Sequence, residues 1–368
     1  MGSSSGATVI RALIIGVSSL ATDLIEKLGR HSGYEVVGVV AERADNDQLG
    51  RGLPILGALA DLDRIVRRAR PDLIVVAQTD RRGLLPIRQL LDSQIRGRVS
   101  VEDGSAFFER LTGALELATL TPASVLFSQV FQPSRWRLQS TRVLGVVLAL
   151  VALVAALPLC VLIALAIKLD SRGPVFFVQE RLGVFGKPFR LVKFRTMIPA
   201  EGETSEWVRD NNQRITRVGD LLRKFRLDEL PQLVNIVKGD MNLVGPRPHP
   251  VRNGEILTML ARNLCDLSGI DIPYYTLRCL VRPGITGWAQ VRYGYANDFA
   301  EELEKIKYDL YYIKHVSLGL DLSILLETIR VVVRGRASSL LGSSARAGRC
   351  RPVLPWALSR KIVDSRSA

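Results

Sequence analysis

An uncharged run from Val143 to Ile167, 25 residues long, constrains this chain more than any other feature. A membrane-spanning helix needs about 20 apolar residues, so the run is long enough to cross a bilayer. A buried helix of this length in a soluble protein would normally keep a polar face, and this run has none. The run therefore predicts a helix embedded in a membrane.

Pro158 lies past the middle of the run, where it removes a backbone donor and clashes with the preceding turn. We therefore expect the helix to kink or break there. Basic residues occur on both flanks, at Arg135, Arg137 and Arg142 before the run and at Lys168, Arg172 and Arg181 after it. The positive-inside rule assigns both flanks to the cytoplasm, which suits a re-entrant helix over residues 143–167. An ordinary tilted transmembrane helix with a kink is the alternative.

The whole chain is both basic and apolar. Its 368 residues are enough for two domains, and they carry a net charge of +14 with a mean hydropathy of +0.16. This charge indicates an anionic partner, and the hydropathy favours a membrane surface or phosphorylated substrates over nucleic acid. The cysteines form no CxxC pair, which argues against a zinc site or a disulfide framework and favours a reducing, cytosol-facing environment.

The N-terminal third alternates β-rich and helical patterns. From Val9 to Val40 an apolar run, a glycine turn and a helical pattern lead into a second β-rich run, and two further helix-strand repeats end near residue 102. Such alternation predicts a parallel sheet covered by helices on both faces. Residues 9–132 thus predict a Rossmann-like, CoA-binding-like domain, preceded by a leader at residues 1–8.

The first turn of this domain departs from the dinucleotide fingerprint G-x-G-x-x-G. Ser18 follows Gly16 where the second glycine belongs, and Ala21 takes the third place. The second glycine normally lets the backbone approach a pyrophosphate, so Ser18 argues against tight NAD binding. We favour a regulatory or assembly domain, and a nucleotide-sugar oxidoreductase is the weaker alternative.

Two carboxylates stand side by side in a basic stretch, at Asp228 and Glu229. Basic residues lie around them at Arg223, Lys224, Arg226 and Arg247. Apolar spacing predicts a helix from Val218 to Phe225, and Pro231 with Gly239 predicts a second short helix beginning near Asp228. A helix N-terminus favours an ionised carboxylate. A plain N-cap is the alternative for Asp228, but it explains neither Glu229 nor the arginines.

Further basic side chains lie in three other segments. Residues 173–197 predict a short hairpin, in which Lys193 and Arg195 project from one face and form a platform for phosphate. A solvated strand face is the alternative. Two prolines fix the turn that presents Arg247, and Arg282 begins a second turn rich in proline and glycine.

Two amphipathic patterns follow, over residues 299–313 and 318–333, and their apolar stripes suit either a core or a bilayer surface. Beyond them the chain is rich in Ser, Gly and Arg. Residues 337–368 predict a disordered basic tail that can adhere to anionic lipid, although a tail without a role is the competing view.

Four motifs, in order and spacing, carry a resemblance to a known family. They are KFRTM at 193–197, RLDELPQLVNIVKGDMNLVGPRP at 226–248, RPGITGWAQV at 282–291 and YDLYYIKHVSLGLDLSILLETI at 308–329. Over residues 135–336 the chain resembles the bacterial polyprenyl-phosphate sugar-1-phosphate transferases, monotopic phosphoglycosyl transferases that initiate exopolysaccharide synthesis. Longer members carry a similar Rossmann-like domain, often after several transmembrane helices, so this chain is expected to be a short form or a truncated one.

The resemblance implies transfer of sugar 1-phosphate from a nucleoside diphosphate sugar, most often a UDP-sugar, to undecaprenyl phosphate, with release of UMP. By the family pattern Asp228 is the nucleophile that forms a phosphosugar-aspartyl intermediate, and Glu229 helps to hold Mg²⁺. Phosphate binding is assigned to the basic positions that match the family motifs, which are Lys193, Arg223, Arg247 and Arg282.

The resemblance also implies a re-entrant helix bent at Pro158, on the cytoplasmic face of the bacterial inner membrane. Family members often have serine where this chain has Leu157. The expected fold is α/β, with a Rossmann-like parallel-sheet domain followed by a mostly α, membrane-associated catalytic domain. A catalytically idle, nucleotide-sensing scaffold of the exopolysaccharide machinery is the alternative function. The sugar and the oligomeric state, a homo-oligomer included, stay open.

Overall fold

The computed structural model describes residues 9–42, 54–78, 85–95, 97, 99–120, 125, 127, 131, 134–199, 213–268, 274–293 and 299–333. Contacts divide the chain into two compact units, the first ending at Leu120 and the second beginning at Thr121. This boundary precedes the sequence-based limit at residue 132. The predicted leader at 1–8 and basic tail at 337–368 lie outside the described residues.

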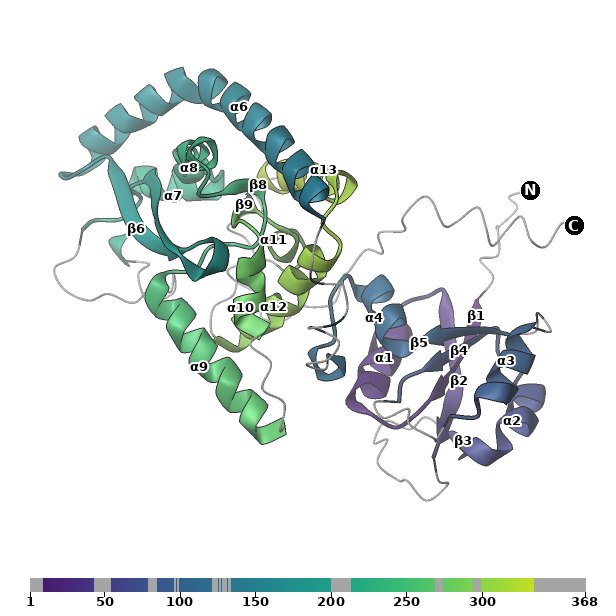
Figure 1. Cartoon of the computed structure of the whole chain (residues 1–368). Helices are drawn as coiled ribbons and strands as arrows, with labels where there is room; N and C mark the ends of the chain where they lie inside the picture. Colours follow the sequence, from purple (N-terminus) through teal and green to yellow (C-terminus); the bar gives the residue numbers. More distant parts are fainter. Residues whose placement is uncertain are drawn as a thin grey trace, which may run out of the picture. The chain divides into compact units, whose positions relative to one another are not determined.

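The first unit is built on a five-stranded parallel sheet in the order β3-β2-β1-β4-β5 (Figure 1). Its strands are β1 (Ile10–Ile15), β2 (Tyr34–Ala41), β3 (Ile55–Ala58), β4 (Leu73–Val76) and β5 (Ser100–Asp103). Its helices are α1 (Ser19–Gly29), α2 (Leu62–Ala69), α3 (Ile87–Ile95) and α4 (Gly104–Thr112), with short 3₁₀ turns at Leu59–Asp61 and Leu117–Thr119. This strand order is that of a Rossmann-like sheet.

Alternate residues of the central strand serve two cores, because successive strand side chains point to opposite faces. Ala12 and Ile14 pack with α1 and α4, whereas Leu13 and Ile15 pack with α2 and α3. The prediction of a parallel sheet covered on both faces is confirmed. The four-residue strand β3 and helix α4, which follows β5 without an intervening turn, were not predicted.

The turn after β1 contains Gly16 at φ 108°, where a Cβ would lie 3.0 Å from the backbone of Gln78. Only glycine adopts this conformation readily. Ser18 then caps α1, since its Oγ accepts from the Ala21 amide at 3.1 Å and donates to the Ala77 carbonyl at 2.5 Å. The Ser18 hydroxyl thus occupies the helix N-terminus at which Rossmann domains receive a pyrophosphate.

The second unit is mostly helical and begins with α6 (Arg135–Asp170). The hairpin β6 (Phe176–Leu182) and β7 (Pro188–Phe194) follows, with antiparallel pairing as predicted. The remaining strands are β8 (Asn242–Val244) and β9 (Gly284–Thr286), which pair in parallel. Its other helices are α7 (Arg217–Lys224), α8 (Gln232–Lys238), α9 (Val251–Ser268), α10 (Tyr274–Leu277), α11 (Trp288–Arg292), α12 (Phe299–Lys314) and α13 (Leu318–Val333). Single 3₁₀ turns lie at Val184–Gly186, Leu227–Glu229 and Arg278–Leu280.

Helix α6 is the one helix among the described residues that is long and apolar enough, by length and composition, to cross a membrane. Its most apolar window has a mean hydropathy of 3.1, and only 11% of that window is buried. Outward residues such as Val154, 73% exposed, and Leu162, 64% exposed, continue this apolar surface along the helix. So large an exposed apolar face is unusual in a soluble protein and indicates membrane association.

Of the kink or break expected at Pro158, a break is excluded, because α6 continues as a single helix through this residue. Proline removes only its own amide, and the hydrogen bonds on either side keep the helix intact. Figure 1 shows α6 as an arch that changes direction along its length. The helix is therefore bent, and the re-entrant topology stays a prediction.

The inner face of α6 holds the rest of the unit together. Towards its N-terminal half, Ala149 packs with Leu191 of β7, with Leu233 and Ile236 of α8 and with Met241. Towards its C-terminal half, Ile163 and Ile167 pack with Phe194 and Leu222. The hairpin, α7 and α8 are thus anchored directly to the apolar helix (Figure 1).

Candidate active site

The adjacent acids lie in the 3₁₀ turn Leu227–Glu229, between α7 and α8. Arg226 turns the chain with φ 54°, an uncommon conformation for a residue other than glycine. Leu227 and Leu230, which flank the acids, pack against the core formed by Ile163 and Ile167 of α6. The two carboxylates are thereby held beside the apolar helix at fixed positions.

Helix α8 begins at Gln232, four positions after the predicted start at Asp228. The N-cap positions of the 3₁₀ turn and of α8 are Arg226 and Pro231, so Asp228 caps neither element. The N-cap explanation of Asp228 is therefore wrong. Gly239 ends α8 at φ 103°, as predicted.

Glu229 is 6% exposed and is held by arginines. Arg247 Nη2 donates to Glu229 Oε1 at 2.9 Å, and Arg226 Nη1 lies 4.0 Å from Oε2. Although burial favours the protonated acid, Arg247 and then Arg226 hold the pKa of Glu229 below its ordinary value. Glu229 is therefore a fixed carboxylate, ionised at neutral pH.

Asp228 is equally buried, at 8% exposed, but no hydrogen bond to its carboxylate is found within the described part of the chain. Burial, followed by the charge of Glu229, raises the pKa of Asp228 to about 6. The charges of Lys193, Arg223 and Arg247 act in the opposite direction. Asp228 is thus an ionisable carboxylate near Lys193, Arg223 and Arg247, without a hydrogen bond to its carboxylate among the described residues.

Lys193 and Arg223 lie close enough to Asp228 for their charges to lower its pKa, and their role in phosphate binding stays a prediction. Lys193 is at the end of β7, with Nζ 5.0 Å from the centroid of the Phe177 ring. Burial, followed by the charge of Arg181, lowers the pKa of Lys193 to about 8. Arg223 in the last turn of α7 donates from Nε to Thr196 Oγ1 at 3.1 Å. Both side chains stay cationic near neutral pH.

Arg195 does not join Lys193 in a phosphate platform. Its guanidinium donates to the carbonyls of Arg172 and Ser171 at 2.5 and 2.8 Å, at the C-terminal end of α6. The alternation of the strand places Lys193 and Arg195 on one side, but Arg195 lies one residue beyond the end of β7. It serves the unpaired carbonyls of a helix end instead.

Arg282 is placed at the opposite end of α8 from the acids. Its Nε donates to the Gly239 carbonyl at 3.0 Å. Arg142 binds the carbonyls of Ile236 and Met241 nearby, at 2.6 and 2.7 Å. The described residues thus bring Lys193, Arg223 and Arg247 together around the acids, and Arg282 stands apart from them.

The turn that begins with Arg282 reaches the site through a different residue, Gln290 in α11. Arg226 Nη1 donates to Gln290 Oε1 at 3.3 Å, so Gln290 fixes the arginine that faces Glu229. Apart from the presence of both residues in motifs, no sequence pattern indicates this contact.

A buried polar network behind Arg247 was also missed. Arg278 Nη2 donates to the Arg247 carbonyl at 3.0 Å and pairs with Asp309 Oδ2 at 2.7 Å. Arg278 Nη1 lies 2.8 Å from His249 Nδ1, and His249 Nε2 lies 3.1 Å from Glu302 Oε2. The network therefore ties α12 and the 3₁₀ turn Arg278–Leu280 to the turn that carries Arg247.

The state of His249 follows from its neighbours. Since arginine is only a donor, Nδ1 accepts from Arg278 and the ring proton lies on Nε2, directed at Glu302. Burial, followed by the charge of Arg278, lowers the pKa of His249 to about 4. A signal existed in the sequence, because Glu302, Lys305 and Asp309 lie at positions i, i+3 and i+7, on one face of a helix.

The acid pair offers carboxylate oxygens of the kind that Mg²⁺ binds, and the predicted magnesium ion would have to share its ligands with substrate. No group of three or more His, Cys, Asp or Glu side chains occurs within the described residues, so an ion held wholly by the protein does not fit there. Mg²⁺ is commonly bound by one or two carboxylates together with substrate phosphates. Glu229 Oε2 is buried and lacks a hydrogen-bond partner, which makes it a candidate ligand beside Asp228.

The segment that contains this site matches a known protein family. Residues 136–335, from the first turn of α6 to the end of α13, match the family model of the bacterial sugar transferases. The chain belongs to this family. The sequence-based limits of 135–336 agree with the matched segment, and the parallel-sheet unit lies outside it.

Curated relatives align over about half of the chain. A UDP-N-acetylgalactosamine-undecaprenyl-phosphate N-acetylgalactosaminephosphotransferase of Aeromonas hydrophila is 43% identical over 195 residues, 53% of this chain and 44% of the relative. A UDP-glucose:undecaprenyl-phosphate glucose-1-phosphate transferase of Escherichia coli is 41% identical over 50% of this chain and 38% of the relative. A protein of the same name from Caulobacter vibrioides is 43% identical over 51% of this chain and 67% of the relative. The chain thus spans less than half the length of the first two.

Proposed function

We propose that this chain transfers sugar 1-phosphate from a UDP-sugar to undecaprenyl phosphate, releasing UMP, through a covalent intermediate on Asp228. The proposal rests on the unequal state of two adjacent acids. Glu229 is fixed by Arg247 at 2.9 Å, whereas the Asp228 carboxylate is surrounded by cations without a hydrogen bond within the described residues. A nucleophile needs such a carboxylate, and an acid with only a structural role does not.

Two displacements at the same phosphorus account for the reaction. A carboxylate oxygen of Asp228 attacks the sugar-bearing phosphorus, and the bond to the bridging oxygen breaks, so UMP leaves with the electron pair. A phosphate oxygen of undecaprenyl phosphate then attacks the phosphorus of the intermediate. The bond to Asp228 breaks, the carboxylate is restored and the product is undecaprenyl diphosphate-sugar. Covalent catalysis divides one difficult displacement into two easier ones.

The basic side chains have separate tasks in this scheme. Lys193 and Arg223 face Asp228 and are placed to bind the phosphate oxygens on which negative charge is carried. Arg247 holds Glu229 and keeps this acid ionised. When bound by Asp228 and Glu229, Mg²⁺ would neutralise charge on the diphosphate of the donor. Arg282, at the far end of α8, is expected to take part in phosphate binding only if the substrate extends that far.

The substrate classes follow from the relatives and from the membrane helix. Relatives named for UDP-glucose and for UDP-N-acetylgalactosamine share undecaprenyl phosphate as the acceptor named with them, so this acceptor is the firmer part of the proposal. A site beside α6 suits an acceptor whose hydrocarbon tail stays in lipid while its phosphate reaches the interface. We place the site at the cytoplasmic face of the bacterial inner membrane, where nucleotide sugars are made.

Mass spectrometry of the full chain with Mg²⁺ and a UDP-sugar, in the absence of acceptor, tests the proposal. We expect release of UMP and a phosphosugar adduct on Asp228, with UDP-glucose and UDP-N-acetylgalactosamine as the first donors. Asp228→Asn should abolish both signals. Asp220→Asn, which changes an exposed acid in the first turn of α7, is the matched control and should retain both.

The possible outcomes distinguish covalent catalysis by Asp228 from direct displacement and from a catalytically idle scaffold. Turnover by Asp228→Asn would remove this residue as the nucleophile. Turnover by the unaltered chain without any adduct would favour direct displacement. Donor binding without UMP release from any UDP-sugar, even when undecaprenyl phosphate is present, would favour a catalytically idle scaffold.

A further inference from the structure

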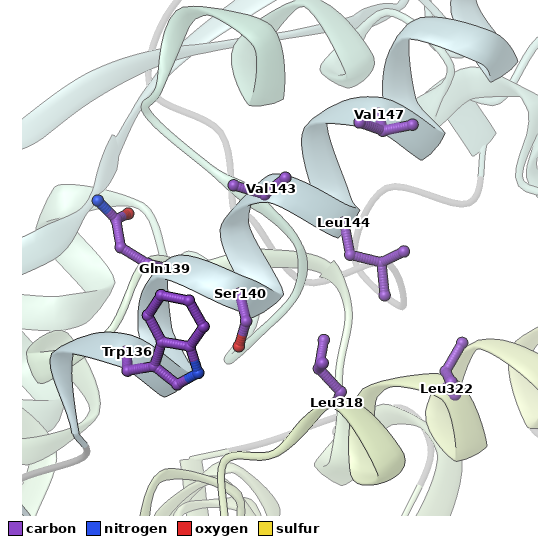
Figure 2. A pocket seen from close by; sticks show the side chains of 8 residues that line it. All are labelled: Trp136, Gln139, Ser140, Val143, Leu144, Val147, Leu318 and Leu322. Carbon is purple, nitrogen blue, oxygen red and sulfur yellow. The ribbon is translucent and has the colours of Figure 1, made fainter.

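A groove lies between the first turns of α6 and the start of α13. It has a volume of about 610 Å³ and lies within the size range of small-molecule sites. The α6 residues that line it are Trp136, Gln139, Ser140, Val143, Leu144 and Val147, and the α13 residues are Leu318 and Leu322 (Figure 2). None of these side chains belongs to the site around Asp228.

The groove is almost wholly apolar, and its few polar groups, on Trp136, Gln139 and Ser140, lie at one end and contribute little to its surface. Trp136, Ser140, Val143 and Val147 follow the helix at intervals of four, three and four residues, so they form one continuous stripe. The stripe changes from indole and hydroxyl groups to aliphatic groups, and in Figure 2 Leu144 and Leu318 point toward one another across the groove. Such a site suits an amphipathic molecule with a hydrocarbon chain.

Two cations lie next to Trp136 in the sequence of α6, although neither lines the groove. Arg135 and Arg137 flank Trp136, and both are exposed. No ion pair of either arginine is found in the part of the chain that the structure describes. Arg135 lies one turn before Gln139, and the Arg137 carbonyl accepts from Ser140 Oγ at 2.9 Å. The head of the bound molecule should therefore carry negative charge.

We propose that the groove binds one anionic phospholipid, with an acyl chain along Val143, Val147 and Leu322 and the phosphate at Arg135 and Arg137. The groove is continuous with the exposed apolar face of α6, where Val151 is 64% exposed. The hydrocarbon that surrounds this face in a membrane is lipid. Trp136 is 79% exposed in the first turn of α6, and tryptophan favours the zone in which the polar and apolar parts of a bilayer meet.

The polyprenyl acceptor is a poorer occupant, although it also carries phosphate and hydrocarbon. The acids lie beside Leu227 and Leu230, which pack against α6 at Ile163 and Ile167. From Ser140 to these positions is about 35 to 40 Å along the helix. An acceptor with its phosphate at Asp228 therefore cannot place the same phosphate at Arg135 and Arg137. The lipid site does not depend on the proposed reaction.

Fluorescence quenching tests the proposal on the full chain reconstituted in phosphatidylcholine vesicles. The signal is the difference between the unaltered chain and Trp136→Phe, which isolates Trp136 from the other tryptophans. We expect brominated phosphatidylglycerol to quench this signal more strongly than brominated phosphatidylcholine at equal content. Changing Arg135→Gln and Arg137→Gln together should weaken the apparent affinity for phosphatidylglycerol about 30-fold.

A matched pair of variants tests the apolar wall. Leu322→Asn should reduce the quenching, whereas Leu326→Asn should not, because Leu326 is also exposed on α13 but does not line the groove. Equal quenching by the two brominated lipids would overturn the proposal. Displacement of the quencher by undecaprenyl phosphate, but not by unlabelled phosphatidylglycerol, would assign the groove to the acceptor instead. Loss of quenching at high protein density would assign it to a second copy of the chain.

Discussion

Asp228 and Glu229 are adjacent in sequence and almost equally buried, and they differ in their partners. Arg247 and Arg226 compensate the charge of Glu229, whereas Lys193, Arg223 and Arg247 only partly offset the cost of burying Asp228 next to a second carboxylate. Paired acids whose pKa values are driven apart commonly have different chemical roles. The two acids are therefore suited to different roles, Glu229 to positioning and Asp228 to reaction with the substrate.

The cost of charging Asp228 predicts that Asp228→Asn stabilises the protein. Its pKa, about 6 when folded, is raised above the ordinary value of 3.8, so folding becomes less favourable as pH rises from about 4 to 6. At pH 7 the neutral amide avoids this cost. We expect a gain on the order of 1 to 3 kcal/mol in the free energy of unfolding.

Thermal unfolding between pH 4 and pH 7 measures this gain. The difference between Asp228→Asn and the unaltered chain should be small at the lowest pH, grow towards pH 6 and then stay constant. Asp220→Asn, at an exposed position, serves as the control and should show no such trend. A destabilised Asp228→Asn variant at pH 7 would contradict the assignment of Asp228 as a strained carboxylate.

The pH dependence of adduct formation is a second prediction at this scale. Only the carboxylate attacks, so the second-order rate of adduct formation should fall as pH drops through about 6, the pKa of Asp228 in the free protein. Glu229→Gln removes a neighbouring negative charge that raises this pKa. We therefore expect the acid limb of Glu229→Gln to move to lower pH, whatever its overall rate. A limb that stays in place or moves upward would show that Glu229 does not influence the titration.

At the scale of elements, the turn that presents Arg247 depends on α12 through the Arg278–Asp309 pair. Both side chains are almost fully buried, and removal of one partner of such a pair costs about 3 to 5 kcal/mol. Asp309→Asn should lower the free energy of unfolding by this amount. It should also raise KM for the donor, because Arg278 no longer holds the Arg247 carbonyl.

Instability alone could change KM, so a coupling measurement separates the two effects. Arg247→Ala should slow adduct formation strongly in the unaltered chain and less in the Asp309→Asn background, because Arg247 is then already displaced. Glu304→Gln, which removes an exposed ion pair on the same helix, is the control and should change stability by about 1 kcal/mol or less. Additive effects of Arg247→Ala and Asp309→Asn would contradict a positioning role.

The elements that could be predicted are those with a periodic pattern of apolar residues in their own sequence. The apolar run, the hairpin over 173–197 and the amphipathic helices each show a period that a short window of sequence reveals, and all were found at about the predicted residues. Strand β3 is only four residues long and α4 follows β5 directly, so neither has a pattern or a turn signal of its own. The bend of α6 was predicted from Pro158, but the continuity of the helix depends on hydrogen bonds on both sides.

Sequence motifs identified the candidate site residues, but not the contacts that their side chains make. The segments that carry Lys193, Arg223 and the two acids are anchored to α6, and Arg247 is joined to them through Glu229. Arg282 occupies a motif of equal quality, yet its guanidinium binds the Gly239 carbonyl at the other end of α8. Contacts such as Arg278 with Asp309, 31 residues apart, require knowledge of how the segments pack. Sequence identifies a basic residue, but tertiary packing decides whether it meets a phosphate or a helix end.

At the scale of the whole molecule, the bend of α6 and the positive charge on both of its flanks favour a topology in which both ends of the helix lie on the same side of the membrane. If the helix enters and leaves the bilayer by the same face, Ser134 and Arg172, which flank it, are both cytoplasmic. If α6 spans the bilayer, one of them is outside. Their exposure makes both positions suitable for labelling, and no catalytic role is assigned to either.

We expect the same-face arrangement, and cysteine labelling can measure it. Ser134→Cys and Arg172→Cys, each in a background with the four native cysteines changed to serine, are treated with a membrane-impermeant maleimide. Both should be unreactive in intact spheroplasts and reactive in inverted vesicles. Reaction of one position from each side would establish a span.

Pro158→Ala restores the missing amide donor, so the helix should straighten and expose one of its ends on the far side. A straightened helix would also carry α7 and α8 away from the interface, since both pack on α6, and UMP release should fall with the change in topology.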